Sequence, residues 1–279
     1  MSFKAALIQM RSGVDMARNL SDASAMTRQA AVQGAQYVLT PEMTNIFEAD
    51  RERLKSFARP EEDDVCVASF SQLAKELGIW LHVGSLALRA SPEKLVNRSL
   101  LFSTDGKVAA RYDKIHLFDV DMPSGERIRE SDIFAPGGEA VVAELPWGKL
   151  GLSICYDMRF PNLYNTLANA GAMFLAAPAA FTVPTGKAHW HVLLRSRAIE
   201  TGSFVFAAAQ GGSHECGRDT FGHSLVVTPW GEIIAELDTE PGVLVFDVDE
   251  ALVKRDRGRI PALKNARAFN LKLTGGMVI

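Results

Sequence analysis

The sequence has no apolar run long enough to cross a bilayer and no large excess of charge of either sign. A membrane-spanning helix needs about 20 consecutive apolar residues, and the start, MSFKAALIQM, is too short in its apolar part and too soon interrupted for a signal peptide. Basic residues number 30 against 33 acidic ones, a net charge of −3. This balance gives no electrostatic footprint for nucleic acid or for a membrane surface. We therefore expect a cytoplasmic protein that binds neither.

Cysteine is also scarce, and phosphate-binding loops are absent. The chain contains three cysteines, Cys66, Cys155 and Cys216, without CxxC spacing, a pattern that indicates neither a disulfide framework nor a zinc knuckle. Neither GxGxxG nor GxxxxGK[ST] occurs, so no nucleotide cofactor is implied. His189 and His191 form an HxH pair, but residues two apart on a helix point to different faces, and no third ligand follows nearby. We predict no cofactor and no metal.

Short apolar runs of β-forming residues recur along the whole chain, with helical stretches between several of them. Hydrophobic residues make up 47% and charged residues 23%, which is typical of a globular protein with a large core. Pro60 and Gly78 predict the ends of a helix over 61–77, and another helix is expected over 187–201. The alternation of strands and helices favours an α/β fold.

An internal repeat extends this prediction. Residues 31–41, AVQGAQYVLTP, resemble residues 168–178, ANAGAMFLAAP, with seven positions from glycine to proline in both. GIWLHVG then corresponds to GSFVFAA, and the hairpin-like stretch 100–113 corresponds to 225–238. Two similar halves predict two sheets packed face to face with helices outside, in one domain. The alternative is chance similarity between common turn sequences.

Cys155 lies where an apolar strand meets charged residues. The run Leu150–Ile154 predicts a strand that ends at this cysteine, and Pro161 and Gly171 predict the start and stop of the following helix. A thiol in a strand-to-helix turn faces the positive end of the helix, so we expect its pKa to lie below the ordinary value of about 8.5. The alternative is that Cys155 is a buried packing residue.

Two charged residues have the same setting at the end of a strand. Glu42 follows the Gly-Ala strand of the first half, and Lys114 follows the first hairpin. Each alone is more typical of a solvated loop, but stacked sheets can bring strand ends together. A carboxylate, an ammonium and a thiol suffice for covalent acyl transfer, because they supply a base, an oxyanion donor and a nucleophile.

Three blocks of sequence, TPEMTN, YDKIHLFD and SICYDMRFPNLY, resemble the signatures of the nitrilase superfamily of carbon–nitrogen hydrolases. The similarity extends over nearly the whole chain. It implies an α/β fold, a four-layer αββα sandwich of two related halves, in a homodimer or larger homo-oligomer. On this interpretation the catalytic domain covers residues 1–260, and residues 261–279 form a C-terminal arm that contacts a partner subunit.

The resemblance also assigns roles. It makes Glu42 the general base, Lys114 the oxyanion-stabilising cation and Cys155 the nucleophile that forms a thioester. Glu130, in RESDIFAPGG, matches a second glutamate that orients Lys114 and the substrate amide; its alternative is a surface loop charge. The backbone N–H of Tyr156 is the expected second oxyanion donor.

Within the superfamily, the stretch from TGKAHWH to VVTPWG is most similar to the Nit branch. Members of that branch act as amidases on deaminated glutathione or, as omega-amidases, on α-ketoglutaramate, and FGHS favours the first. Both substrates have an α-keto acid end, for which Thr182, Thr185 and His189 are binding candidates. Other amidase, carbamoylase or nitrilase activity, and a catalytically silent binding scaffold, are the alternatives.

Overall fold

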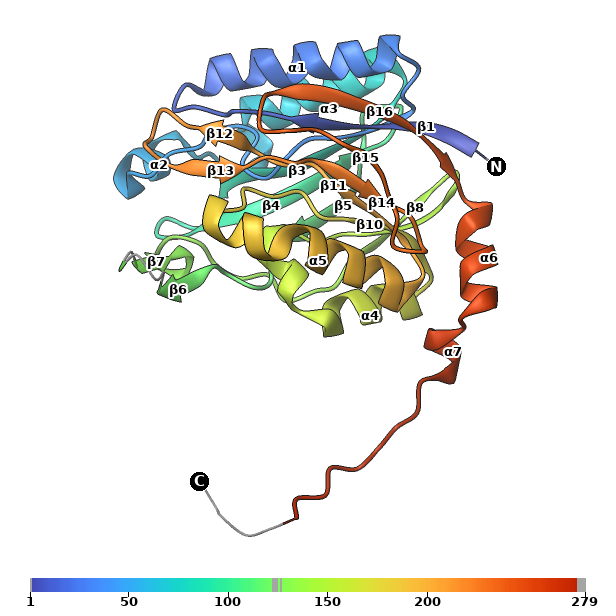
Figure 1. Cartoon of the computed structure of the whole chain (residues 1–279). Coiled ribbons are helices and arrows are strands. Elements are labelled where there is room, and N and C mark those ends of the chain that lie inside the picture. The colour runs from blue at the N-terminus through green and yellow to red at the C-terminus, as the bar shows by residue number, and fades with distance from the viewer. Residues whose placement is uncertain (1, 122–124, 126, 275–279) are drawn as a thin grey trace.

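The computed structural model describes residues 2–121, 125 and 127–274, and its centre is a pair of six-stranded sheets (Figure 1). The first sheet has the order β16-β1-β2-β3-β4-β5, with β1 Ser2–Gln9, β2 Tyr37–Leu39, β3 Trp80–Arg89, β4 Leu95–Phe102, β5 Val108–Asp113 and β16 Gly242–Asp249. The second has the order β15-β14-β11-β10-β9-β8, with β8 Val142–Leu145, β9 Gly148–Gly151, β10 Ala172–Ala176, β11 Phe204–Ala207, β14 Leu225–Val227 and β15 Ile233–Glu236.

Both sheets have the same pairing pattern. In the first, β1, β2 and β3 are parallel neighbours, while β16, β4 and β5 pair antiparallel at the two sides. In the second, β9, β10 and β11 are parallel, while β8, β14 and β15 pair antiparallel. The matched sequences fall on β2 and β10, on β3 and β11, and on the hairpins β4–β5 and β14–β15. The internal repeat is therefore structural, and the prediction of two related halves is confirmed.

Helices cover the outer face of each sheet, which gives the four layers (Figure 1). Helices α1 (Met16–Val32) and α3 (Val65–Leu77) pack on the first sheet, and α4 (Pro161–Asn169) and α5 (Val183–Thr201) pack on the second. Between the sheets lies an apolar core that includes Tyr37, Phe174 and Phe206, all fully buried. Burying one such side chain stabilises the fold by about 1.5–3 kcal/mol. The predicted αββα sandwich is confirmed.

The remaining elements are short. They are α2 Arg51–Phe57, the 3-10 turns η1 Glu61–Asp63, η2 Glu130–Asp132 and η3 Cys155–Arg159, the two-stranded pairs β6 Asp119–Asp121 with β7 Arg127–Arg129 and β12 Gly211–Ser213 with β13 Asp219–Phe221, and the helices α6 Ala251–Arg259 and α7 Ala262–Asn265. Among the described helices, none has the length and apolarity to span a membrane.

Two helix starts differ from the prediction. The helix expected over 61–77 begins at Val65, because the Asp64 side chain accepts hydrogen bonds from the N–H groups of the first turn and caps the helix there. It ends as predicted at Gly78, which has φ +64°. The helix expected from residue 187 begins earlier, at Val183, with a proline in its first turn.

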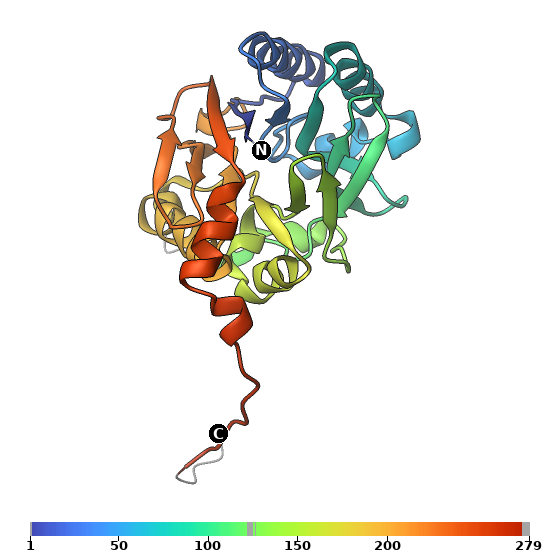
Figure 2. The ribbon, with the colours of Figure 1, turned by 90° about the vertical axis from the view of Figure 1, so that its right-hand side faces the viewer.

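The C-terminal segment leaves the body of the molecule. After α7, residues 266–274 have no regular structure and extend away from both sheets (Figure 2). Phe269, Leu271 and Leu273 on this segment are 91%, 82% and 84% exposed. The predicted arm, 261–279, ends in residues 275–279, which lie outside the described residues, and its contact with a partner subunit stays a prediction.

The two halves meet closely at one glycine on β3. A Cβ atom placed on Gly84 would lie 2.5 Å from the Pro178 side chain of the second half and 2.6 Å from the Pro41 carbonyl oxygen of the first. Backbone atoms on this side leave no space for relaxation. A side chain at this position therefore pushes apart the segments that follow β2 and β10.

We expect Gly84→Ala to lower the free energy of unfolding by at least about 1–3 kcal/mol, as overpacking does, measured by urea denaturation. Gly258→Ala is the matched control, because Gly258 lies on exposed α6 with no atom within 4 Å of an added Cβ, and alanine in a helix is more favourable than glycine by about 0.5–1 kcal/mol. Equal stability of the Gly84 variant and the wild type would contradict this account of the junction.

Candidate active site

A cavity of about 620 Å³ opens where the strand ends of both halves meet. Its walls include Glu42, which follows β2, Lys114, which follows β5, Glu130 in η2 and Cys155 at the start of η3. These are the four predicted catalytic side chains, and the structure brings them into one cavity.

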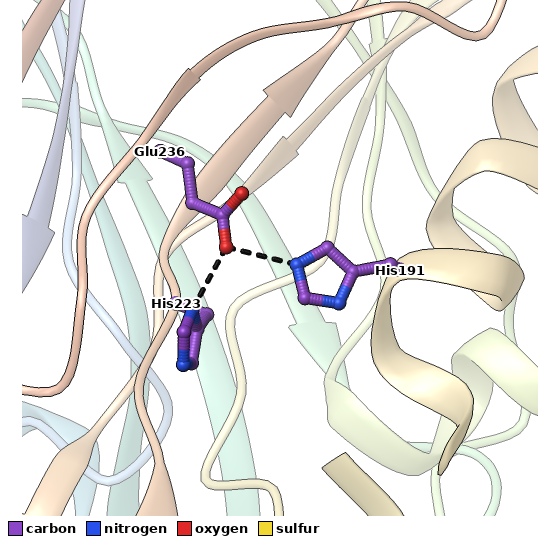
Figure 3. Close-up of side chains that lie close together, drawn as sticks. All are labelled: His191, His223 and Glu236. Carbon is purple, nitrogen blue, oxygen red and sulfur yellow. Dashed lines mark hydrogen bonds and ion pairs between the residues drawn. The ribbon is translucent and has the colours of Figure 1, made fainter. Parts of the chain in front are cut away.

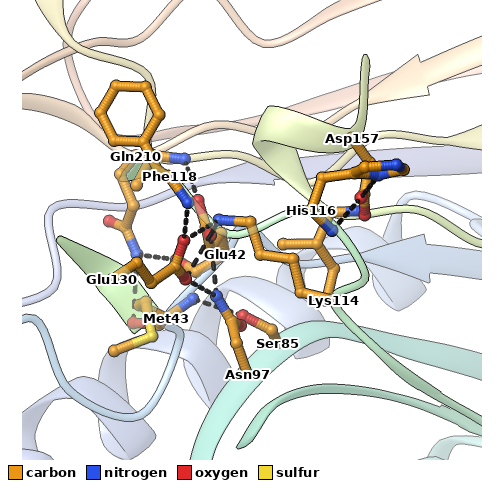
Figure 4. A network of polar contacts seen from close by, with 12 residues as sticks. Glu42, Met43, Ser85, Asn97, Lys114, His116, Phe118, Glu130, Asp157 and Gln210 are labelled. Carbon is orange, nitrogen blue, oxygen red and sulfur yellow. Dashed lines mark hydrogen bonds and ion pairs between the residues drawn. The ribbon is translucent and has the colours of Figure 1, made fainter. Parts of the chain in front are cut away.

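The centre of the site is a buried lysine between two carboxylates (Figure 4). Lys114 Nζ lies 2.9 Å from Glu42 Oε1 and 2.9 Å from Glu130 Oε2. The side chains of Lys114, Glu42 and Glu130 are only 3%, 6% and 12% exposed. Burial by itself lowers the pKa of Lys114, but the charges of Glu130 and Glu42 more than offset this and raise the pKa well above its ordinary value. Lys114 is therefore a permanent cation in the wall of the cavity.

The Glu42 carboxylate is held from both halves. Its Oε1 atom accepts a hydrogen bond from Asn97 Nδ2 on β4 at 2.9 Å, in addition to the one from Lys114. Its Oε2 atom accepts one from the backbone N–H of Ala180, beyond β10 in the second half, at 2.8 Å. The carboxylate is therefore fixed in position by donors from both halves of the chain.

Glu130 is fixed in a similar way. Its Oε2 atom accepts a hydrogen bond from the Phe118 N–H at 2.6 Å, and its Oε1 atom accepts one from Asn97 Nδ2 at 3.2 Å. Asn97 thus donates to both glutamates, while its own Oδ1 atom is buried without a hydrogen-bond partner among the described residues. The structure places Glu130 in the lysine network and not on a free surface loop.

The Cys155 backbone adopts a conformation that is uncommon outside glycine. Its φ is +49°, and its N–H donates to the Pro178 carbonyl at 2.8 Å. The preceding strand β9 ends at Gly151, earlier than predicted, and η3 separates Cys155 from the start of α4 at Pro161. The sequence analysis predicted that the N-terminal end of the following helix lies beside the sulfur. In the structure, α4 begins six residues after Cys155, so this prediction does not hold.

The predicted low pKa of the thiol is wrong for this state of the site. Burial and the negative charge of Glu42 raise the pKa of Cys155 well above its ordinary value, and the opposing effect of Lys114 does not compensate. The residue is 8% exposed. The raised pKa keeps the proton on the thiol, beside the Glu42 carboxylate. It needs a base before it can react.

Asp157 links the turn that contains Cys155 to the segment that contains Lys114. Its buried carboxylate accepts hydrogen bonds from the Ile154 N–H at 2.8 Å, from the Tyr112 hydroxyl at 2.7 Å and from the His116 N–H at 3.0 Å. The His116 Nδ1 atom lies 2.7 Å from the same carboxylate (Figure 4). Because Tyr112 and His116 flank Lys114 in sequence, Asp157 sets the position of Cys155 relative to Lys114.

Of the other four predicted site residues, three line the cavity and one does not. Tyr156, Thr182 and Thr185 line the cavity, and the hydroxyls of the two threonines lie 2.8 Å apart. His189 is not among the lining residues, because α5 begins at Val183 and runs away from the cavity. Its Nδ1 atom lies instead 3.2 Å from a guanidinium nitrogen of Arg159.

Sequence reasoning missed Asn97, Asp157 and a group of arginines that line the cavity. A buried polar residue inside an apolar strand is the signal that Asn97 offered, and an aspartate two residues after the cysteine is the signal for Asp157. The lining arginines are Arg51, Arg127, Arg129 and Arg218. The first three form ion pairs with aspartates. Arg218 is exposed and lies next to Asp219 in the cavity wall, and among the described residues it forms no ion pair.

Comparison with known proteins identifies the family of the chain. The family model "Carbon-nitrogen hydrolase" matches residues 4–257. The chain is 39% identical over 265 residues to the deaminated glutathione amidase of Yersinia enterocolitica, covering 94% of this chain and 92% of the relative. It is 36% identical over 273 residues to human omega-amidase NIT2, covering 96% of each.

The fold has close structural neighbours as well. The crystal structure of Saccharomyces cerevisiae Nit3, described as a member of branch 10 of the nitrilase superfamily, superimposes with a TM-score of 0.85 at 30% identity, over 93% of this chain and 94% of that one. The family predicted from the three sequence blocks is confirmed. The chain belongs to the carbon-nitrogen hydrolase family of the nitrilase superfamily, whose members act on carbon–nitrogen bonds other than peptide bonds.

Proposed function

We propose that this protein is a cysteine amidase that hydrolyses a small carboxylate-bearing amide, deaminated glutathione, through a thioester. The observation that carries the proposal is the single cavity in which the Cys155 thiol, the Glu42 carboxylate and the Lys114 ammonium meet. These are a nucleophile, a base and a fixed positive charge. The amidase names of the relatives support the same reaction.

The reaction begins with proton transfer from Cys155 to Glu42, which makes the thiolate. The sulfur attacks the amide carbon, and the oxyanion that forms is stabilised by Lys114 and by the Tyr156 N–H. Glu42 then returns the proton to the leaving amine as the C–N bond breaks, leaving a thioester on Cys155. Water, deprotonated by Glu42, attacks the thioester; the acid leaves and the thiol is restored. Glu130 keeps Lys114 in position throughout.

The charge of the cavity supports an anionic substrate. Arg218 offers an exposed guanidinium on the cavity wall, next in sequence to Asp219 and Thr220, which also line it. Guanidinium groups bind carboxylates through paired hydrogen bonds. Thr182 and Thr185 supply hydroxyls on the same wall. A volume of about 620 Å³ is also large enough for a substrate bigger than α-ketoglutaramate, such as deaminated glutathione.

We also propose that the chain assembles into a homodimer or larger homo-oligomer through its C-terminal arm. Phe269, Leu271 and Leu273 are almost fully exposed on a segment that contacts no sheet. Apolar side chains at such positions are stabilised by burial against another surface. A cytoplasmic location stays a prediction.

Cys155→Ala is expected to abolish hydrolysis, because the Cys155 sulfur is the nucleophile that lies beside Glu42 and Lys114. The melting temperature should fall little, since the change removes one sulfur beside an existing cavity. Turnover of deaminated glutathione and thermal unfolding measure the two effects. Cys66→Ala is the control, because Cys66 is buried in α3 on the outer side of the first sheet; it should stay active. An active Cys155 variant would exclude the mechanism.

Glu42→Gln is expected to lower the pKa of the Cys155 thiol, because the Glu42 charge is one of the groups that raise it. Thiolate then forms at lower pH, so iodoacetamide should alkylate Cys155 faster than in the wild type at neutral pH, while hydrolysis is lost. The pH profile of alkylation tests this. Glu130→Gln, which also removes a carboxylate from Lys114, should shift the profile less. An unchanged or higher inflection would refute the assigned coupling.

Arg218→Gln is expected to raise KM for deaminated glutathione about tenfold or more, the effect of one charge-assisted hydrogen bond, with little change in kcat. A neutral amide without a carboxylate should be unaffected. Arg28→Gln, on the outer face of α1, is the matched control. Equal KM values in wild type and variant would remove Arg218 from the substrate site.

The same assay separates the alternative functions. Deaminated glutathione, α-ketoglutaramate, a carbamoyl amide and a nitrile are compared by kcat/KM. Preference for α-ketoglutaramate, for the carbamoyl compound or for the nitrile would each replace the proposed substrate. No turnover of any of them, with Cys155 still alkylated, would favour the binding scaffold.

A further inference from the structure

A second cluster of chemically active side chains lies outside the catalytic cavity (Figure 3). His191 is on α5, His223 is between β13 and β14, and Glu236 is on β15. Their ligand atoms all lie within 4.8 Å of one another. None of the three lines the catalytic cavity, and the mechanism above uses none of them.

We propose that this cluster binds a divalent transition-metal ion of the zinc class. His191 Nε2 and His223 Nδ1 each lie 2.8 Å from the same oxygen, Glu236 Oε1. Two imidazole nitrogens and one carboxylate oxygen form a ligand set that zinc uses, with water at the fourth position. The ion replaces the protons that now join the two rings to the carboxylate, because both nitrogens face the same point.

A fourth residue supports this assignment. His223 Nε2, the nitrogen that faces away from the cluster, lies 3.8 Å from Asp238 Oδ1. Histidines that bind metal commonly direct their second nitrogen to a carboxylate, which fixes the tautomer and strengthens the ligand. At 3.8 Å this contact has an ion-pair distance and is not a hydrogen bond. When an ion takes the place of the proton at His223 Nδ1, the Asp238 carboxylate lies on the Nε2 side of the ring, where a supporting acid is expected.

The imidazole of His223 is also held in position by the fold. Its backbone N–H donates to the Asp238 carbonyl at 2.9 Å, and its own carbonyl accepts from Nε1 of the buried Trp190 at 2.8 Å. Trp190 precedes His191 on α5, so this hydrogen bond holds the helix segment with His191 against the backbone of His223. The Phe221 ring stacks on His223, with ring centroids 4.2 Å apart. The ligands are thus positioned before any ion arrives.

The backbone of His223 lies in the left-handed region. Its φ is +56°, a conformation in which histidine, like asparagine and aspartate, is enriched among residues other than glycine. The side chains of His191, His223 and Glu236 are 35%, 25% and 31% exposed, so an ion can reach them from solvent.

Bound zinc would join three segments of the second half, namely α5, the turn before β14, and β15. These segments are brought together only in the folded chain. An ion that binds the folded state alone raises the melting temperature according to its concentration and affinity. The inference does not depend on the proposed amidase reaction, because it concerns residues outside that cavity.

The experiment is calorimetric titration of zinc alone into the intact, metal-free chain, with thermal unfolding measured in parallel. We expect one site, and a melting temperature that rises with added zinc. His191→Ala, His223→Asn and Glu236→Gln should each weaken zinc binding at least about tenfold. Asp238→Asn removes a supporting carboxylate and should weaken zinc binding by no more than about a hundredfold. Asparagine is chosen at position 223 because it tolerates the left-handed backbone.

His189→Ala is the matched control, because it removes one imidazole from the same helix without touching the cluster, and it should bind zinc as the wild type does. The metal-free variants should melt close to the wild type, which separates lost binding from lost folding. Cobalt bound in place of zinc should give visible bands without a thiolate charge-transfer band. Zinc affinity that survives in all three cluster variants, or that is lost in Cys155→Ala, would overturn the proposal.

Discussion

A buried ammonium is the interaction on which the rest of the site depends. Lys114 cannot stay charged in the interior without partners, and its two glutamates supply them from different parts of the chain. Each glutamate is in turn fixed by backbone N–H groups, one of which belongs to Ala180 in the second half. Removal of either carboxylate partner from such a buried network typically lowers the free energy of unfolding by about 3–5 kcal/mol. The hydrogen bonds that position the catalytic side chains therefore also hold the two halves of the chain together.

The same network determines when the thiol reacts. Glu42 raises the pKa of Cys155 and Lys114 lowers it, so the two charges act on the sulfur in opposite directions. In the resting cavity the carboxylate and burial dominate, and the thiol keeps its proton. Transfer of that proton to Glu42 removes the opposing negative charge at the moment the thiolate forms, and leaves Lys114 to stabilise it. A high resting pKa is thus compatible with a reactive nucleophile, provided that its base is in contact.

The layers were predicted from the internal repeat, and three of the central side chains were predicted from their places at strand ends, whereas Glu130 was assigned only by the resemblance to the nitrilase superfamily. The repeated Gly-Ala strands imply equivalent positions in two sheets, and Glu42, Lys114 and Cys155 each follow a strand. The sign of the pKa shift at Cys155 was not predictable, because it depends on burial and on Glu42, a residue distant in sequence. His189 lies four residues beyond Thr185 on α5 and is not among the residues that line the cavity.

The histidine cluster, like the catalytic site, is formed by residues that are distant in sequence and meet only in the fold. Sequence reasoning examined His191 only with its neighbour on the helix, where no shared face exists, and found no nearby third ligand. The sheet provides what the helix does not, because the hairpin that contains Glu236 and the turn that contains His223 both lie against α5. The first half has its counterpart hairpin in β4–β5, at whose end Lys114 lies. In both halves, chemistry arises where the end of a hairpin meets a segment distant in sequence, and only the fold reveals which residues meet.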